Sequence, residues 1–365
     1  MPQTTTTSVA WAQAVDFAAR AFEGAGVPRD DARKAADALV DADLHGVSTH
    51  GLKNLRNYVT ALLEGRVNPR AQIRDVGGGA AARVLSGDNG LGHVVGHAGM
   101  GRAIELAREY GVGTVFVRDS NHYGASQYWA RLALRHNMVG FAFTNAFASM
   151  APWGGKENLV GNNPPAWALP TRVVSPDEEF PPGETDPVFL DIALSVVAGN
   201  KLDIYRRRGD PIPLGWALDE DGQPTTDPAA RAKGGSFVPI ADYKGSGLAI
   251  VLSLVNSFLA GGPFDDQRTQ GPNRTPIPGA CCHWFAAYDV AQFADPEAFT
   301  AAVRGVQDRV RSSPPRAGFE RVYAPGEIEN ARARRYRAEG IPLESFVFDD
   351  LRWVAERTKI TYELA

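Results

Sequence analysis

Apolar side chains in the first part of the chain recur at the three- and four-residue spacing of helices. Residues 9–43 carry this pattern, and Gly24 and Gly26 divide it into two helices. A polar hinge follows at residues 43–51, and leucines recur at helical spacing over residues 52–63. The sequence therefore predicts three helices, separated by a glycine break and by a polar hinge.

The middle of the chain alternates between short β-rich runs and helical patterns, which is typical of an α/β architecture. Helices are predicted at residues 94–110, where Gly111 ends the pattern, and over the apolar stretch 248–259. A stretch rich in Pro, Asp and Glu, residues 175–187, predicts an exposed loop. Strands are predicted at residues 82–85, 112–117, 139–144, 188–192 and 281–288.

The chain beyond residue 296 returns to helical and charged patterns. We expect this segment to pack beside the N-terminal helices. The chain would then consist of a helical N-terminal part (1–74), an α/β part (75–295) and a helical C-terminal part (296–365).

Composition and charge exclude several classes of protein. The formal net charge of -4 comes without the clustered Lys and Arg of a nucleic-acid binder. The most apolar run, residues 247–260, is too short to span a bilayer and contains Ser253 and Asn256, and the polar N-terminus does not resemble a signal peptide. The adjacent Cys281 and Cys282 could bridge each other only with strain, so we expect free thiols in a reducing compartment and a cytoplasmic protein without membrane contact.

A glycine-rich segment, Gly90–Gly96, opens a predicted helix between two predicted strands. Its spacing allows a Rossmann-type NADP site, with Arg118 after the second strand. Asp88 and Asn89 stand where such a site needs the apolar end of a strand, so the motif is weak evidence and is kept as an alternative.

His93 and His97 are four residues apart, so they share one helix face, as the histidines of many zinc sites do. No Glu or Cys lies between them to complete a ligand set, and we expect no metal. A metal-dependent lyase is the corresponding alternative, and a chelator would test it.

The polar hinge contains the pair Thr49-His50 between Gly46 and Gly51. Because histidine has a pKa near neutrality, a His held at a helix start can give or take a proton at a reacting group. The same residue could instead cap the helix or bond a backbone carbonyl. Spacing alone leaves both interpretations open.

Two further segments combine polar side chains with glycines where strands end or helices begin. Residues 120–126 follow a strand and could form a ligand cradle whose backbone amides meet a phosphate, or a turn with a buried histidine. Residues 242–247 open the apolar helix with Lys244 and two glycines, which suits a phosphate or a carboxylate but lacks the spacing of a Walker motif.

Asp191 lies in the apolar strand at residues 188–192, where an unpaired carboxylate is costly. A histidine partner would relieve this cost and would fix the imidazole tautomer. The alternative is that Asp191 caps a neighbouring helix.

Six groups of segments in chain order resemble the malate/L-lactate dehydrogenase family of the second type. This family includes malate, sulfolactate and ureidoglycolate dehydrogenases, diketogulonate reductase and the cyclic imino acid reductases. The resemblance runs nearly end to end, and several motifs in the right order are more specific than any one alone. The segments are residues 43–58, 120–125, 150–155 with 161–164, 191–195, 243–248, and 314–318 with 325–327.

The resemblance implies a non-Rossmann α/β fold of the sulfolactate/malate dehydrogenase type. In such a fold a mixed sheet forms the cofactor- and substrate-binding domain, and both termini contribute to a helical domain. It further implies an intertwined homodimer, a small-molecule substrate, and NADP or NAD as cofactor, with NADPH preferred.

The resemblance also assigns roles to residues of this chain. His50 falls on the family's catalytic histidine, Asp191 on its carboxylate partner and Thr49 on the relay hydroxyl. On the substrate side we expect Lys53, Arg56, Tyr58 and His122, with Lys53 or Arg56 as a substitute for the arginine that many members have where this chain has Asn54. The cofactor side would be formed by His122, Tyr123, Gly124, Ala125, Ser126, Thr144, Asn145, Asn163, Pro164, Asp191, Lys244 and Gly245.

Three positions depart from the family pattern. Thr49 replaces a serine and Asn162 replaces a threonine. Asn54 stands where many members have an arginine that binds the substrate carboxylate through two parallel hydrogen bonds, which Asn cannot do. Plain malate and lactate are therefore not the expected substrates.

The function expected from this resemblance is hydride transfer between a nicotinamide and a small 2-oxo or 2-hydroxy acid or a cyclic imino acid. His50 would serve as the proton donor or acceptor. A catalytically inactive homologue that only binds a small molecule is the remaining alternative.

Overall fold

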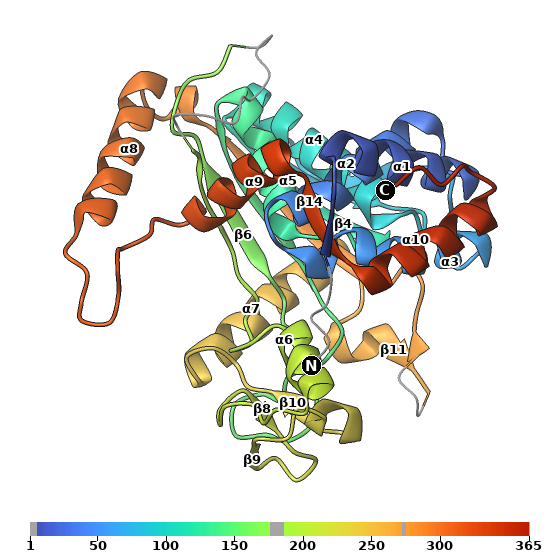
Figure 1. The fold of residues 1–365 in the computed structure, drawn as a ribbon. Helices are drawn as coiled ribbons and strands as arrows, with labels where there is room; N and C mark the ends of the chain where they lie inside the picture. The colour runs from blue at the N-terminus through green and yellow to red at the C-terminus, as the bar shows by residue number, and fades with distance from the viewer. Residues whose placement is uncertain (1–5, 176–185, 272–274, 365) are drawn as a thin grey trace.

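The computed structural model describes residues 6–175, 186–271 and 275–364 (Figure 1). A seven-stranded sheet lies at its centre, with the strand order β2-β3-β4-β13-β5-β6-β7. β3 and β4 are parallel and the other neighbouring pairs are antiparallel, so the sheet is mixed. Its strands are β2 (Arg74–Gly78), β3 (Ala82–Ser86), β4 (Val112–Ser120), β13 (Cys281–Asp289), β5 (Met138–Thr144), β6 (Pro165–Leu169) and β7 (Val188–Asp191).

Helices cover both faces of this sheet. α4 (Gly92–Tyr110) and α5 (Ser126–Leu132) share a core with Val115, Val117 and Phe285 on one face. α7 (Tyr243–Ala260) packs on the other face, where Phe116 and Trp284 lie. Because β4 and β13 bury side chains on both faces, they read in the sequence as nearly continuous apolar runs.

The N-terminal helices and the last described helix form one helical unit. β1 pairs antiparallel with β14, and α10 packs on α1, on α3 and on the turn Leu52–Asn54. One hydrophobic core joins these elements, with Phe17, Leu39 and Leu351 fully buried in it. The elements are β1 (Thr6–Val9), α1 (Trp11–Gly24), α2 (Arg29–Leu44), α3 (Leu55–Leu63), β14 (Ile341–Glu344) and α10 (Ser345–Thr358).

A small lobe adjoins the N-terminal end of α7 and lies below the sheet in Figure 1. Leu202, Ile212 and Phe237 form its core. Its elements are α6 (Gly199–Arg208), β8 (Ala217–Leu218), β9 (Pro224–Thr225) and β10 (Ser236–Phe237), and the short strands β11 (Thr269–Gln270) and β12 (Thr275–Pro276) pair farther along the chain.

The segment beyond residue 296 divides between two places. α9 (Glu327–Glu339) packs against α2 and β14, whereas α8 (Pro296–Ser312) stands apart from the N-terminal helices (Figure 1). Arg304 and Gln307 of α8 donate hydrogen bonds to backbone carbonyls of Thr171 and Asp186, which fixes the helix near the end of β6. The expected packing beside the N-terminal helices is therefore wrong for α8, and the part boundaries at residues 74 and 295 stay a prediction.

Most predicted elements are confirmed, including the helices at residues 9–43, 94–110 and 248–259 and all five strands. The sequence did not predict β2, which contains two glycines, or β6, which begins at a proline. The loop predicted at residues 175–187 lies mostly outside the described residues.

The Rossmann alternative at Gly90–Gly96 is wrong. A Cβ atom on Gly92 would lie 2.2 Å from the carbonyl oxygen of Asn121, and one on Gly96 would lie 3.0 Å from the Trp129 ring. These glycines therefore let α4 pack closely on the backbone of residues 121–122 and on the Trp129 ring. The sheet, with one parallel pair, also lacks the Rossmann strand order.

Candidate functional site

The hinge between α2 and α3 presents the Thr49-His50 pair on a 3-10 turn, Ser48–His50. Gly46 ends α2 with a left-handed φ of 76°. Gly51 is required by packing, because a Cβ there would lie 2.1 Å from the Asp43 carboxylate, which accepts a hydrogen bond from the Leu52 amide at 2.7 Å. The hydroxyl of Thr49 lies 2.6 Å from Nδ1 of His50. The hinge thus holds the imidazole from both sides.

Three side chains from separate elements meet at this hinge. The rings of His50 and His122 stack with centroids 5.4 Å apart and an interplanar angle of 19°. The hydroxyl of Tyr58, on α3, lies 2.6 Å from Nδ1 of His122. The ring of Tyr58 also meets the buried His93 edge-on at 4.8 Å. We refer to His50, His122 and Tyr58 as the imidazole cluster.

Electrostatics keep His50 uncharged at neutral pH. Burial, and next the positive charge of Lys53, lower the pKa of His50 to about 4. A neutral imidazole has one nitrogen that can accept a proton. Since Nδ1 faces the Thr49 hydroxyl, Nε2 is the nitrogen left for a reacting group.

A cavity of about 450 Å³ opens beside the imidazole cluster. His122 and Tyr58 form part of its wall, together with the buried Arg268 and the exposed Arg66. No carboxylate is among the described residues that line it. The other lining residues are Asn54, Asn57, Ala61, Val67, Leu91, Asn121, Phe147, Pro276, Ile277, Pro278 and Cys281. The cavity is therefore positively charged and partly apolar, which suits a small organic anion.

Asp191, the last residue of β7, has a partner other than His50. Its Oδ2 accepts a hydrogen bond from the backbone amide of Gln127, in the first turn of α5, at 2.8 Å. Burial raises the pKa of Asp191 to about 6, against the hydrogen bonds from the Gln127 and Ser126 amides. No hydrogen bond joins Asp191 to His50 among the described residues. The structure therefore shows the helix-capping contact, and the relay role with His50 stays a prediction.

The capping contact also bears on the cradle predicted at residues 120–126. The amides of Ser126 and Gln127 already face the Asp191 carboxylate, so they are not free for a phosphate. Tyr123 points into the core, where its ring stacks on His283 with centroids 4.4 Å apart. Gly124 keeps a left-handed φ of 81°, and a Cβ there would lie 3.1 Å from Nε2 of His93. Of this segment, only His122 and Asn121 line the cavity.

Three residues predicted to line the cofactor form a buried network instead. Thr144 Oγ1 lies 2.8 Å from His283 Nδ1, Asn145 donates to Ser257 Oγ at 3.1 Å, and Asn163 donates to Asp265 at 2.7 Å. The carbonyl of Pro164 accepts a hydrogen bond from Ser126. These contacts join β5, β13 and α7, and contact with a cofactor stays a prediction.

The predicted basic residues are placed differently from one another. Arg56 is exposed, pairs with Asp350 at 2.6 Å and lies over the Trp353 ring, so it does not line the cavity. Lys53 lowers the pKa of His50 but is likewise not a lining residue. Lys244 is exposed at the start of α7 and pairs with no carboxylate of the described residues. Gly245 beside it is required by packing, since a Cβ there would lie 1.9 Å from the Ile240 carbonyl oxygen.

Neither of the paired histidines on α4 resembles a metal ligand. Both ring nitrogens of His93 lack hydrogen-bond partners, and Nε2 of His97 lies 3.2 Å from the Tyr128 hydroxyl. Over the described ranges, no group of three or more His, Cys, Asp or Glu side chains could hold a metal ion.

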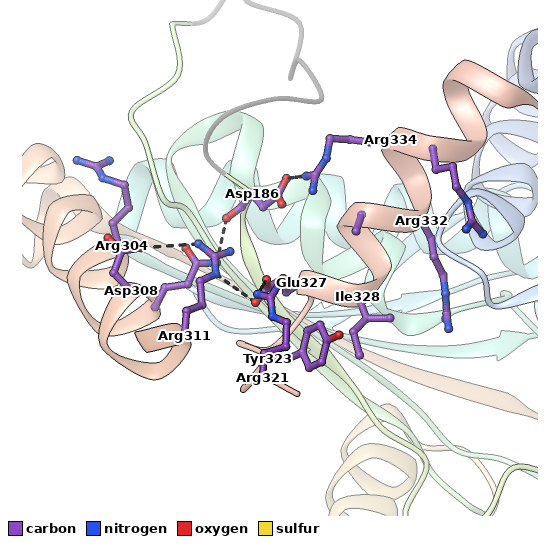
Figure 2. A pocket seen from close by; sticks show the side chains of 13 residues that line it. Asp186, Arg304, Asp308, Arg311, Arg321, Tyr323, Glu327, Ile328, Arg332 and Arg334 are labelled. Atoms are coloured by element: carbon purple, nitrogen blue, oxygen red, sulfur yellow. Dashed lines mark hydrogen bonds and ion pairs between the residues drawn. The ribbon is translucent and has the colours of Figure 1, made fainter. Parts of the chain in front are cut away.

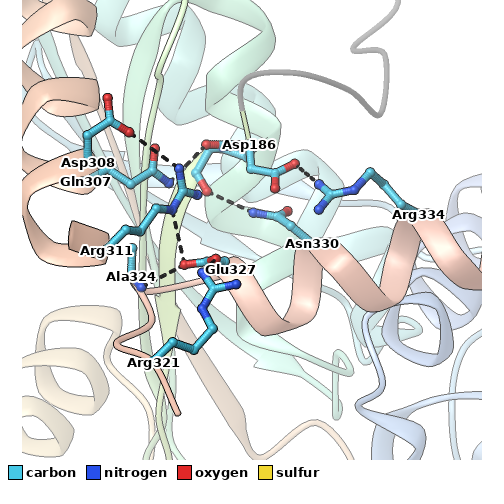
Figure 3. Close-up of polar contacts among 10 residues, drawn as sticks. Asp186, Gln307, Asp308, Arg311, Arg321, Ala324, Glu327, Asn330 and Arg334 are labelled. Carbon is cyan, nitrogen blue, oxygen red and sulfur yellow. Dashed lines mark hydrogen bonds and ion pairs between the residues drawn. The ribbon is translucent and has the colours of Figure 1, made fainter. Parts of the chain in front are cut away.

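A larger cavity of about 1040 Å³ lies between α8 and α9 (Figure 2). Six arginines line it. Three of them form ion pairs within its wall, because Glu327 pairs with Arg311 and Arg321, and Asp186 pairs with Arg334 (Figure 3). No histidine and none of the predicted site residues lines it. The smaller cavity beside the imidazole cluster is therefore the candidate site.

Comparison with known proteins shows which family this chain resembles. The family model for malate/L-lactate dehydrogenase matches residues 9–352. A (2R)-3-sulfolactate dehydrogenase (NADP(+)) from Chromohalobacter salexigens is 37% identical over 345 residues, covering 93% of this chain and 96% of the relative. A ureidoglycolate dehydrogenase (NAD(+)) from Escherichia coli K12 is 29% identical over 328 residues, covering 90% of each chain.

Solved structures show the same likeness. A malate dehydrogenase from Pyrococcus horikoshii OT3 superposes with a TM-score of 0.87 at 31% identity, covering 98% of this chain and 97% of that one. A delta1-piperideine-2-carboxylate reductase from Pseudomonas syringae superposes with a TM-score of 0.80 at 26% identity, covering 96% of this chain and all of that one. The predicted non-Rossmann α/β fold is confirmed.

Proposed function

Because the chain belongs to the malate/L-lactate dehydrogenase family and is therefore an oxidoreductase, we propose that it transfers hydride between a nicotinamide cofactor and a small organic acid. The acid is a 2-oxo or 2-hydroxy acid, or a cyclic imino acid. The single observation that supports this best is the imidazole cluster, His50, His122 and Tyr58, beside a cationic cavity of about 450 Å³. Such a site offers proton donors and acceptors next to room for a small anion.

Two polar groups outside the lining of the cavity are available to a nicotinamide dinucleotide. Lys244 offers an ammonium group that no described carboxylate neutralises, at the start of a long helix where phosphate groups are favoured. The buried amide nitrogen of the Gln127 side chain has no partner beside the cradle. We propose that His122, Gly124 and Lys244 contact the cofactor, which supplies the hydride when bound. NADP is preferred to NAD, as in the similar sulfolactate dehydrogenase.

His50 is proposed to move the proton. Its neutral form can accept the proton of a 2-hydroxy acid when hydride leaves the same carbon. In the reverse direction, the protonated form returns that proton to the developing alkoxide or amine. A negatively charged substrate would favour the protonated form, because an opposite charge nearby raises the pKa of an imidazole.

We propose a homodimer because the outer surface of α7 is apolar. Five large apolar side chains on this helix are exposed, Leu248, Val251, Leu254, Phe258 and Leu259. Trp167 and Leu190, paired neighbours on β6 and β7, are exposed as well. Contiguous exposed apolar surface of this kind marks an interface. We refer to these seven residues as the α7 surface and propose that a second copy covers it.

The cytoplasm is the proposed compartment. Cys281 and Cys282 are buried free thiols, and a reducing compartment keeps thiols in this form.

The test of this function is the loss of reduced-nicotinamide absorbance, with NADPH and NADH, against a panel of acids. The panel holds pyruvate, oxaloacetate, other 2-oxo acids with and without methylamine, and the cyclic imines of proline and pipecolate. Turnover of one class supports the proposal and identifies the reaction. A protein that binds neither coenzyme contradicts it.

A further inference from the structure

Arg268 is a buried cation in the wall of the candidate site. It ends a short 3-10 turn, Asp265–Arg268, between α7 and β11, and only 2% of its surface is exposed. Its side chain donates hydrogen bonds to the carbonyls of Ala280 and Asn145 and to the sulfur of Cys281. The guanidinium carbon also lies 4.5 Å from the centre of the Phe147 ring. These contacts hold the guanidinium in one orientation.

No carboxylate of the described residues lies within ion-pair distance of Arg268. Asp265, a buried acidic residue three positions earlier in the chain, accepts hydrogen bonds from Ser253 at 2.6 Å, from Asn163 at 2.7 Å and from the Gly161 amide at 2.8 Å. Its carboxylate is therefore committed elsewhere. Arg268 and Asp265 are close enough to interact electrostatically, since the charge of Arg268 acts to lower the pKa of Asp265, but no ion pair joins them among the described residues. A buried cation without an ion-paired carboxylate is costly, so a bound anion would stabilise it.

Two nearby residues that could have bound an anion are already engaged. Asn54 donates its side-chain amide to the carbonyl of Thr49 at 2.5 Å and so supports the hinge. Arg56 pairs with Asp350 outside the cavity. Arg268 has five N–H groups and uses three of them in the hydrogen bonds above, so donor capacity is left on the guanidinium.

We propose that Arg268 binds the carboxylate of the substrate, beside the imidazole cluster, and selects 2-oxo or imino acids over neutral carbonyl compounds. A planar guanidinium suits this role, since it can offer two parallel N–H donors to the two carboxylate oxygens. Arg268 then supplies the charge that position 54 lacks in this chain. This inference rests on the proposed function.

The experiment compares the panel acid that wild type reduces fastest with the neutral methyl ester of the same acid. We expect Arg268→Gln to lower kcat/KM for the acid by about 10- to 100-fold, mainly through KM, and to change the value for the ester less than about threefold. The kcat/KM of Arg268→Lys for the acid should lie between those of wild type and Arg268→Gln, because the lysine ammonium keeps the positive charge but cannot donate two parallel hydrogen bonds. Arg102→Gln removes an exposed arginine of α4 and should change neither value.

A second arm measures oxalate binding to the protein by titration calorimetry, without turnover. Arg268→Gln and Arg268→Lys should both weaken oxalate binding, and Arg102→Gln should not. Equal losses on acid and ester, or unchanged oxalate affinity in a folded Arg268→Lys protein, would overturn the inference. If wild type binds oxalate through Arg268 but binds neither coenzyme, the proposed function fails while carboxylate binding by Arg268 stands.

Discussion

Each imidazole of the candidate site has its Nδ1 beside a hydroxyl, that of Thr49 for His50 and that of Tyr58 for His122. This arrangement orients both rings and leaves both Nε2 atoms for ligands. The two residues differ in exposure, because His50 is half-buried while His122 is exposed at the cavity. Proton transfer is therefore assigned to the half-buried His50, and contact with substrate and cofactor is assigned to the exposed His122.

Replacing His50 by alanine should lower kcat by about 10²- to 10⁴-fold, because the proton would then have to go to or come from water. The affinity for NADPH, measured by the fluorescence of the bound nicotinamide, should stay within about threefold. Near-normal turnover in this variant would remove His50 from the mechanism.

The lowered pKa of His50 predicts opposite pH dependences for substrate oxidation and substrate reduction. With a pKa of about 4 in the free protein, His50 is neutral above that pH and protonated below it. Oxidation of a hydroxy acid needs the neutral form, so kcat/KM should rise through this pKa and stay level above it. Reduction needs the protonated form, so kcat/KM should fall as the pH rises. Initial rates in both directions check this, and an oxidation rate that falls above pH 4 would contradict it.

A substitution at Asp191 can distinguish a role in proton transfer from a role in capping α5. We expect Asp191→Asn to lower kcat by at least about tenfold, because an amide cannot stabilise a protonated imidazole. An asparagine oxygen can still accept the Gln127 amide, so the thermal unfolding midpoint should change little. A lower midpoint with unchanged kcat would leave only the capping role.

At this scale, local motifs allowed His50, Thr49 and His122 to be predicted as candidates, because each stands beside glycines in a strand or helix boundary. Arg268 could not be found this way. Its partners Asn145 and Phe147 lie more than 120 positions before it in the chain, and only the folded structure brings them together.

The glycines that begin α4 show how an element is positioned against the site. Gly92 lets the first turn of α4 approach the carbonyls of Asn121 and of His122, a residue of the imidazole cluster. A motif typical of dinucleotide binding therefore serves helix packing in this fold.

Gly92→Ala should destabilise the protein by about 1–3 kcal/mol, because the added methyl group overlaps backbone atoms that cannot easily move. Gly101→Ala in the same helix is the matched control, since a Cβ there contacts nothing within 4 Å and should not destabilise. Urea unfolding measures both. Loss of NADPH affinity in a stably folded Gly92→Ala protein would instead favour the dinucleotide interpretation.

Helices and central strands could be predicted because their apolar periodicity is local. β2 and β6 could not, since glycines in one and a proline at the start of the other hide the strand pattern. The position of α8 depends on hydrogen bonds from Arg304 and Gln307 to distant carbonyls, which periodicity does not encode.

At the scale of the whole molecule, the α7 surface is an apolar area that stays exposed in the single chain. Val251→Asp places a charge at its middle and should convert a dimer into a protein with the 39.2 kDa mass of one chain. Light scattering after size-exclusion chromatography measures this mass. Val76→Asp, at a similarly exposed valine on β2, should leave the dimer intact. A wild-type protein with the mass of one chain would refute the proposed dimer.

The strand order and the β1–β14 pair were beyond sequence analysis. β1 and β14 lie more than 300 positions apart, and β13 pairs with β4 and β5, which lie more than 130 positions before it. The overall fold class was predictable only through the resemblance of several motifs in one order. Periodicity alone indicated helices and strands without saying how the sheet is arranged.

The packing of α10 against α3 and the Leu52–Asn54 turn has a consequence for biosynthesis. Ribosomes make the His50 hinge early and α10 almost 300 residues later. Until α10 emerges, the hinge lacks one of the surfaces that position it, while the sheet can already fold. A nascent chain stalled before residue 345 should therefore contain a structured sheet but no working proton donor, so the enzyme would gain activity only after α10 has been made.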